Sequence, residues 1–330
     1  MQSLVIVHAE KYSHSMREVW NEFNRDAKNG TFLFDRDFME YHSDRFMDHS
    51  LMFRDGDGRI VAEMPAHVDG ATLYSHRGLT FGGVISGFDM TTEGMLSIFS
   101  SMNEYLLGQG IDRLVYKALP HIYHLAPAEE DLYALYRLGA RLTRRDVSSA
   151  IYLPHAEQTG FWRMRSRKIH KAEQSGLAVG RSYEFDSFMD LLSRVLIERH
   201  GVKPVHTNAE IKRLAQRFPD NIKLYAATSR SGALEAGVIV FEHNETVHAQ
   251  YNANSPGGKE IGALDIVYEH LIKEVYPGKK YFDFGISTEK EGMFLNEGLL
   301  KYKESFGARG IAHDFYELNL RDSLDRGVLP

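Results

Sequence analysis

Two charged residues near the C-terminal end of the chain occupy positions where packing alone would favour apolar side chains. Asp283 lies inside the apolar run 281–286, and Lys303 follows Leu299 by four residues and precedes Phe306 by three, on one face of an expected helix. A carboxylate at a strand end can accept a proton or orient an amine. An ammonium group can stabilise the oxyanion that forms when an amine attacks a thioester or ester carbonyl. Together the two residues are suited to acyl transfer.

A structural alternative exists for the same pair. Burying an isolated charge is costly, so Asp283 and Lys303 could pair with one another. Lys303 could also extend its ammonium group to solvent along its own apolar stem. In either case the two residues would stabilise the fold and take no part in chemistry.

An internal repeat sets these two residues apart from the scaffold. Glycines at 94 and 262, 110 and 278, and 139 and 307 are each separated by 168 positions, and several aliphatic residues follow the same spacing. In this register Asp283 corresponds to Val115 and Lys303 to Leu135. Both residues are therefore polar only in the second copy, which favours a functional interpretation.

The elements that must position the pair follow the repeat. The first half predicts antiparallel strands around the turn at 55–58, then a helix over 92–107, a strand over 113–117, a helix over 130–138 and a strand over 147–153. The second half predicts strands over 224–228, 235–242 and 246–252, a loop over 254–260, a helix over 262–275, the strand 281–286, a helix capped by Asn296 that ends near Gly307, and a last strand over 311–318. This is an α+β layout. We expect two units, residues 1–155 and 156–330.

Composition narrows the class of protein. The 330 residues are 43% hydrophobic and 25% charged, as in ordinary globular proteins, and no apolar run is long enough to span a bilayer. We therefore expect a cytoplasmic protein without membrane insertion. With no cysteine, disulfides, thiolate metal sites and a cysteine nucleophile are excluded. His121 and His124 have metal-like spacing but no evident third ligand, so we expect no metal site. The net charge of -6 argues against DNA binding.

The motifs of the second half resemble a known family. The relevant segments are 282–286 (FDFGI), 298–299 (GL) and 302–307 (YKESFG), and the basic segment 165–173 (RSRKIHKAE). They are similar to the Fem-type transferases and other tandem acyltransferases of the GNAT superfamily. The resemblance implies two tandem GNAT-like units, each a mixed, mostly antiparallel sheet flanked by helices, with the active site in the second unit. It also implies that Lys303 takes part in acyl transfer, whereas a catalytic role for Asp283 rests on its position alone.

The resemblance implies transfer of an acyl or aminoacyl group to an amine of a cell-envelope precursor, either a peptide or an amino sugar. The donor would be a co-substrate, acyl-CoA or alternatively aminoacyl-tRNA, with no bound cofactor. The loop before the helix at 262 lacks the full acyl-CoA signature of GNAT enzymes but has glycines that could admit a phosphate. We therefore predict donor-binding residues there: Asn254, Gly257, Gly258 and Gly262. An ordinary turn is the structural alternative.

A basic segment introduces the second unit. A helix over 161–175 concentrates arginine and lysine in an otherwise acidic chain, so it could bind the phosphates of a sugar nucleotide, of CoA or of tRNA, or serve as a solvated linker. We predict that the acceptor is bound by two of its residues and by three from the strand and helix beside Asp283: Arg165, Lys168, Tyr251, Asn252 and Tyr302. A non-catalytic protein that binds a phosphorylated ligand on the same fold is the alternative from another class.

Overall fold

The chain forms two compact units in a computed structural model that describes residues 7–324. Contacts divide the chain into one unit of residues up to Asp146 together with those from Ala312 onward, and a second unit, Val147–Ile311. The sequence placed the boundary at 155 and kept the C-terminal strand in the second unit. The division differs because strand β17 (Arg309–Asn319) pairs antiparallel with β8 (Arg113–Lys117) of the first unit, from Phe315 to Asn319.

The first unit holds two sets of strands. The first has the order β1 (Val7–Lys11), β3 (Leu51–Asp55), β4 (Ile60–Met64) and β7 (Ile85–Ser86). The second runs from the start of β9 (Arg141–Tyr152) through β17, β8, β6 (Thr72–Tyr74) and β5 (His67–Asp69) to β2 (Met47–Asp48). The helices are α1 (Arg17–Asp26), α2 (Arg36–Met39), α3 (Thr92–Gly108), α4 (Glu130–Leu138) and α12 (Leu320–Leu324). The predicted hairpin around 55–58 is present as β3 and β4.

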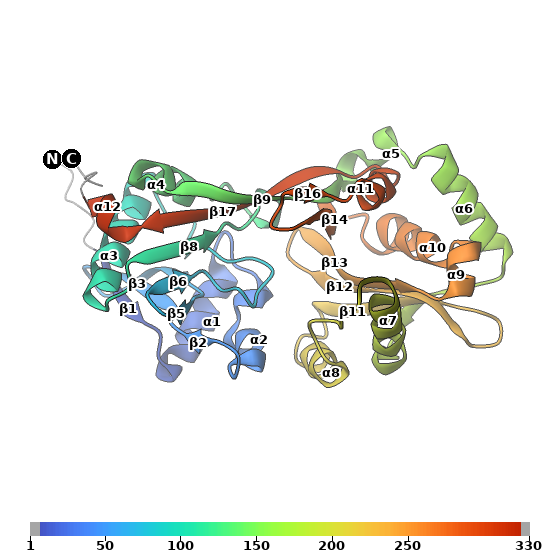
Figure 1. Ribbon diagram of the computed structural model, residues 1–330, viewed down its shortest axis with the longest axis horizontal. Coiled ribbons are helices and arrows are strands. Elements are labelled where there is room, and N and C mark those ends of the chain that lie inside the picture. Colours follow the sequence, from blue (N-terminus) through green and yellow to red (C-terminus); the bar gives the residue numbers. More distant parts are fainter. Residues whose placement is uncertain (1–6, 325–330) are drawn as a thin grey trace. The chain divides into compact units, whose positions relative to one another are not determined.

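The second unit is a mixed sheet. Its strand order is β10 (Ala178–Ser182), β11 (Ile222–Thr228), β12 (Leu234–Glu242), β13 (Thr246–Asn254), β14 (Tyr281–Ile286) and the end of β9, with β13 and β14 parallel and the other pairs antiparallel. Helix α10 (Ala263–His270) packs on one face of this sheet and α7 (Phe185–His200) on the other (Figure 1). The predicted α+β class, with mostly antiparallel sheets, is confirmed.

The remaining helices of the second unit surround this sheet. They are α5 (Ala156–Thr159), α6 (Arg163–Gln174), α8 (Asn208–Arg217), α9 (Pro256–Ile261), a π-helical turn over Leu271–Val275 and α11 (Glu297–Glu304), with a small hairpin of β15 (Thr288–Glu289) and β16 (Phe294–Leu295) before α11. The basic segment is helical as predicted. Within residues 7–324, no helix has the length and apolar character that crossing a bilayer requires.

One feature of the loop region differs from the sequence prediction. The expected loop over 254–260 contains α9, capped by the Ser255 side chain, which accepts a hydrogen bond from the Gly258 amide. The expected helix over 262–275 is present as α10, which begins directly after Gly262 with its φ of 82°, followed by the π-helical turn Leu271–Val275. The two glycines of the predicted donor loop, Gly257 and Gly258, lie in the short helix α9.

Strands β13 and β14 separate part-way along their length. They pair only from Thr246 to His248 on β13, with Tyr281 to Asp283 on β14. Beyond that point β13 continues to Asn254 past a bulge at Gln250, which bends a strand away from its neighbour. On β14, Gly285 takes a φ of 79° and the pairing to β9 shifts. The sheet therefore opens between these two strands, with the pair His248 and Asp283 at the closed end of the opening.

Candidate active site

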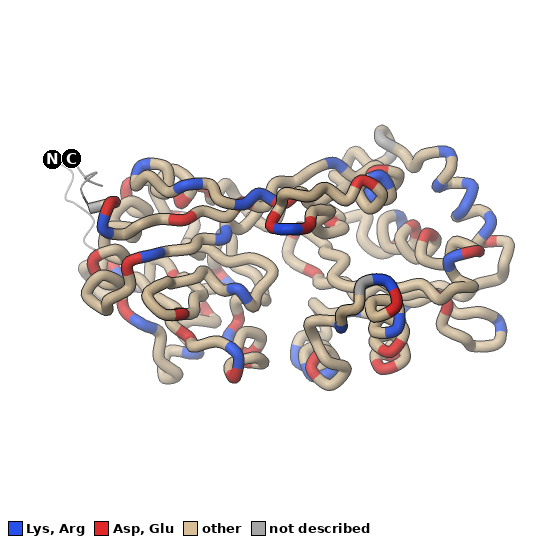
Figure 2. Tube along the Cα trace, viewed as in Figure 1, with Lys and Arg blue, Asp and Glu red and all other residues tan. Residues whose placement is uncertain are grey.

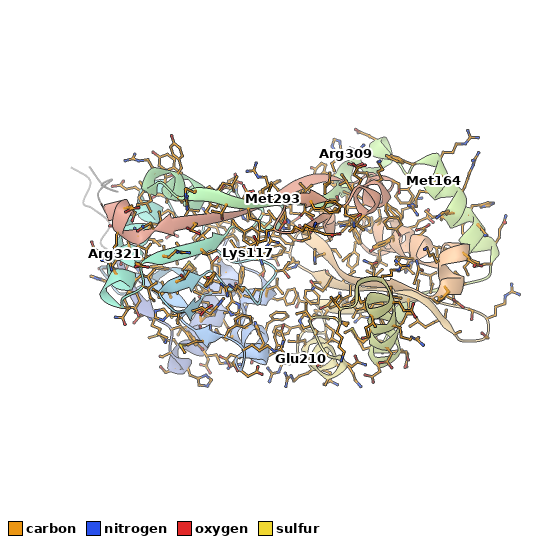
Figure 3. All side chains as sticks on the ribbon, viewed as in Figure 1. Lys117, Met164, Glu210, Met293, Arg309 and Arg321 are labelled. Atoms are coloured by element: carbon orange, nitrogen blue, oxygen red, sulfur yellow. The ribbon has the colours of Figure 1, made fainter. Side chains whose placement is uncertain are left out.

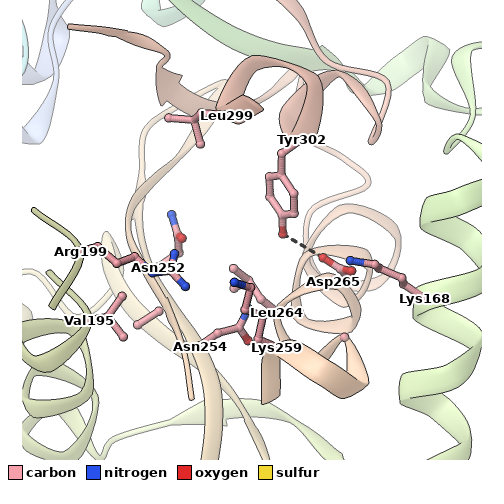
Figure 4. A pocket seen from close by; sticks show the side chains of 12 residues that line it. Lys168, Val195, Arg199, Asn252, Asn254, Lys259, Leu264, Asp265, Leu299 and Tyr302 are labelled. Carbon is pink, nitrogen blue, oxygen red and sulfur yellow. Dashed lines mark hydrogen bonds between the residues drawn. The ribbon is translucent and has the colours of Figure 1, made fainter. Parts of the chain in front are cut away.

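A cavity of about 270 Å³ lies at the end of β13, among helices α6, α7, α9, α10 and α11 (Figure 4). Its wall includes Asn252, Ala253 and Asn254 at the end of β13, and Leu299 and Tyr302 on α11. The other lining residues come from α6, α7 and the α9–α10 segment: Lys168, Val195, Arg199, Lys259, Gly262, Leu264 and Asp265. Five predicted site residues therefore meet in one cavity: Lys168, Asn252, Asn254, Gly262 and Tyr302.

The cavity is cationic. Lys168, Arg199 and Lys259 form no ion pair with any residue in the described range 7–324, whereas the one acid of the wall, Asp265, is neutralised by Arg165 at 2.6 Å. Gly262 brings α6 close to this wall, since a Cβ atom there would lie 2.9 Å from the backbone oxygen of Lys168. Three cations without an acidic partner favour an anionic ligand such as a phosphate group.

Tyr302 places a hydroxyl group at the cavity wall. The hydroxyl donates to Asp265 Oδ1 at 2.9 Å, and the Arg165 guanidinium lies 4.3 Å from the centre of the ring. Burial, followed by the nearby charge of Asp265, holds the pKa of Tyr302 well above its usual range. The phenol therefore stays protonated and acts as a hydrogen-bond donor. Arg165, predicted to bind the acceptor, is buried and does not line the cavity.

Lys303 points away from solvent. Only 5% of the residue is exposed, and its ammonium group donates to the carbonyl oxygens of Gly285 and Ile286, each at 2.7 Å. Burial lowers the pKa of Lys303 to about 8, while the charge of Asp283 opposes that shift. The alternative in which Lys303 extends to solvent is therefore wrong. The ammonium group instead fixes the end of β14 where the sheet opens.

Asp283 is fully buried and bound on both carboxylate oxygens. Oδ1 accepts from Ser148 Oγ at 2.6 Å and from the Gly285 amide at 3.0 Å, and Oδ2 lies 2.8 Å from His248 Nδ1. These contacts join β14 to both neighbouring strands, β9 and β13. Because the carboxylate has no exposed surface, it can act on a bound molecule only through a neighbouring group.

Other predicted residues lie outside the cavity wall. Tyr251 is bonded through its hydroxyl to His206 Nδ1 at 2.6 Å. Gly257 and Gly258 lie in α9, and a Cβ atom at Gly258 would lie 2.3 Å from the backbone oxygen of Glu235, so this glycine permits packing against β12. Arg199, Lys259, Asp265 and His248 were not among the predicted site residues. Only Lys259, inside the predicted donor loop, carried a local signal.

Residues 160–304 match the family described as an acetyltransferase (GNAT) domain. The match lies within the second unit, Val147–Ile311. No curated protein matches the chain in sequence.

Solved structures extend the likeness to the whole chain. The crystal structure of FemX is similar with a TM-score of 0.67 and 12% identity, covering 96% of this chain and 98% of that one. L-PGS from Bacillus licheniformis gives 0.60 and 14%, covering 96% and 94%. A tandem GNAT protein from the clavulanic acid biosynthesis pathway gives 0.50 and 12%, covering 95% and 98%. The predicted tandem GNAT and Fem-type relationship is confirmed at the level of fold.

Proposed function

We propose that this protein is an N-acyltransferase that moves an acyl group from a thioester donor, acyl-CoA, to an amine of a cell-envelope sugar or peptide precursor. The observation that carries the proposal is the cationic cavity at the end of β13, with Tyr302 on its wall. The GNAT domain and the fold of transferases such as FemX support acyl transfer as the reaction class.

The cavity offers complementary groups to each part of a thioester donor. Lys168, Arg199 and Lys259 would pair with phosphates. Asn252 and Asn254 offer amide groups to the pantetheine amides or to the acceptor. The Tyr302 hydroxyl, which stays protonated, would turn its O–H from Asp265 to the sulfur as the thiolate leaves.

Lys303 follows Tyr302 in α11, and its ammonium group binds the end of β14. Its ammonium group holds the carbonyls of Gly285 and Ile286, and its positive charge stabilises an oxyanion that forms at the closed end of the opening. Both acyl-CoA and aminoacyl-tRNA are made in the cytoplasm, so we place the reaction there.

The test has two stages. Thermal shift with acetyl-CoA and longer acyl-CoAs measures binding, and release of free thiol in the presence of amino-sugar nucleotides or peptide precursors measures turnover. We expect stabilisation by acyl-CoA and acceptor-dependent thiol release. Binding without thiol release for any donor and acceptor would instead indicate the non-catalytic phosphate-binding alternative.

Aminoacyl-tRNA is a second candidate donor, favoured by the surface of α6. Arg163, Arg167, Lys168 and Lys171 are exposed along this helix, which Figure 2 shows as a row of basic residues, and Met164 between them is 56% exposed (Figure 3). Lys168 belongs both to this row and to the cavity wall. tRNA binding that weakens steeply with salt, combined with no stabilisation by acyl-CoA, would select this donor.

A further inference from the structure

We propose that the acyl group of the donor is a long hydrocarbon chain, and that it leaves the cavity over an apolar rim formed by Ile286, Met293, Phe294, Leu295 and Leu299. The inference rests on the proposed acyltransferase function and names the class of donor. The five side chains are between 40% and 88% exposed, and among residues 7–324 no other stretch of equal length exposes as many large hydrophobic side chains. Dense exposed apolar surface marks a site that another molecule covers.

Leu299 joins this rim to the cavity, because it is 40% exposed and also lines the cavity wall. It precedes Tyr302 by three residues in α11, so the two side chains lie on one face of the helix, about 5 Å apart along its axis (Figure 4). Tyr302 is the residue that would bond the sulfur of the donor. The acyl group begins at that sulfur, and towards the start of α11 it meets Leu299 and then the rest of the rim.

The cavity itself has a cationic part and an apolar part. Lys168 and Lys259 carry the charge, whereas Val195, Leu264 and Leu299 offer only hydrocarbon. A donor with phosphates at one end and a hydrocarbon chain at the other is complementary to both parts. A short acyl group such as acetyl would end beside Leu299 and leave the rim uncovered.

Hydrogen bonds hold the parts of the rim together. Asn296, which directly follows Leu295, caps α11 by accepting from the Leu299 amide at 3.0 Å. Lys303 of the same helix donates to the carbonyl oxygen of Ile286 at 2.7 Å. The hairpin, the end of β14 and α11 are therefore tied to one another, and the rim is a preformed surface.

The hairpin turn before Met293 is strained. Lys290 and Glu291 take φ angles of 49° and 57°, ahead of Gly292 at 86°. Left-handed backbone is unfavourable for residues with a side chain, and the packing of Met293 does not offset this cost, because the residue is 88% exposed. Strain that packing does not explain is typical of functional segments. The turn therefore presents Met293 beside Phe294 to a ligand.

The test is a series of donors in which only the acyl chain changes. Titration calorimetry measures the Kd of acetyl-, octanoyl-, dodecanoyl- and hexadecanoyl-CoA, each below its critical micelle concentration, and thiol release with the same amine acceptors measures kcat/KM. We expect Kd to fall and kcat/KM to rise by at least about tenfold from octanoyl to dodecanoyl, because each added methylene is buried against the rim. Equal values for acetyl- and dodecanoyl-CoA would overturn the inference while the acyltransferase proposal stands.

A variant of the rim tests the named residues. The double variant Phe294→Ser/Leu295→Ser should lower the ratio of kcat/KM for dodecanoyl-CoA to that for acetyl-CoA by at least about tenfold. Both side chains are more than 40% exposed, so the melting temperature should change little. Val205→Ser is the matched control, since Val205 is 73% exposed in the same unit, outside the cavity wall, and should keep the ratio. An unchanged ratio in the double variant would overturn the inference.

Other occupants of the rim give different results. Suppose the wild type shows no preference for chain length but sediments with phosphatidylcholine–phosphatidylglycerol vesicles, and the double variant does not. The rim would then face a lipid surface, and the inference would be overturned. A dimer in analytical ultracentrifugation that the double variant dissociates, again without a chain-length preference, would overturn it in favour of a second copy of the chain.

Failure of the proposed function is distinguishable from these results. Wild-type protein that binds acyl-CoAs with the expected chain-length preference but turns none of them over would keep the hydrocarbon site and overturn the acyltransferase proposal. Wild-type protein that binds no acyl-CoA would overturn both.

Discussion

The Tyr302 hydroxyl and the Asp265 carboxylate are joined by a hydrogen bond of 2.9 Å at the wall of the cavity. Asp265 is at the same time paired with Arg165 at 2.6 Å, and the guanidinium of Arg165 lies over the Tyr302 ring. The phenol proton therefore points to Asp265 in this structure, and it must turn away from this carboxylate to bond a leaving thiolate. The ring of Tyr302 packs against Arg165, whereas only its hydroxyl bonds Asp265. A substitution by phenylalanine therefore removes the hydroxyl and keeps the packing of the ring.

Tyr302→Phe should lower kcat by about tenfold or more while donor KM changes little, because the hydroxyl supports the leaving thiolate and not the ground state. The ring keeps its contacts, so the melting temperature should stay close to that of the wild type. Tyr276→Phe removes a buried hydroxyl in the same core, bonded to Tyr225 at 3.4 Å and away from the cavity wall, and should retain activity. Equal rates for Tyr302→Phe and wild type would remove the hydroxyl from the mechanism.

Lys303→Met should lose at least about tenfold in kcat, because the charge that stabilises the oxyanion is absent. The fold should persist, since the methionine retains most of the apolar stem and the desolvation cost of a buried charge is relieved. Thiol release and thermal melts measured on the same sample separate the two effects. Lys301→Met, at a position where the side chain is 66% exposed, is the matched control. A fully active Lys303→Met would sink the assignment.

Lys168→Gln and Lys259→Gln should each raise the Kd for acyl-CoA by about three- to tenfold, since each removes a cation from the cavity wall. Their effect should shrink as salt concentration rises. Titration calorimetry at two ionic strengths measures both. Lys212→Gln is the control, because that lysine on α8 pairs with Asp186 at 2.6 Å on the surface. Unchanged affinity in the double variant would place the phosphates elsewhere.

Acid should destabilise the first unit through His67. Burial lowers the pKa of this histidine to about 4, and its ring stacks on Tyr74 with 5.2 Å between centroids. Because the folded state takes up the proton at lower pH than the unfolded state, the free energy of unfolding should be fully present above about pH 6.5 and decline as the pH falls towards 4. Thermal melts between pH 4.5 and 7.5 measure this decline, which His67→Phe should reduce and His8→Gln, an exposed control, should not.

Part of this structure could be read from the sequence because its signals are local. Asn296 caps α11 by accepting from the Leu299 amide, as its position before the helix predicts. Gly307 takes a φ of 91° just beyond the same helix. The repeat register also held, since Val115 and Asp283 lie in the corresponding strands β8 and β14, and Leu135 and Lys303 in the corresponding helices α4 and α11.

The rest depends on contacts that no local pattern encodes. Arg199 reaches the cavity from the end of α7, more than fifty positions before Asn252 in the sequence, and nothing around it distinguishes it from a surface arginine. His248 carries no local signal, and its hydrogen bond to Asp283 became visible only with the parallel register of β13 and β14. Gly258 resembled a phosphate-loop glycine, but close packing against β12 accounts for it.

The passage of β9 from one compact unit to the other limits how the chain can be cut. The GNAT match begins at residue 160, yet β14 is paired along its outer edge with Ala150, Ile151 and Tyr152 of β9, and Asp283 takes a hydrogen bond from Ser148. A fragment that starts at the family boundary would expose the edge of β14 and remove one of the hydrogen bonds that hold the Asp283 carboxylate. A fragment of the second unit must therefore start no later than Val147, so that β14 and Asp283 keep their partners on β9.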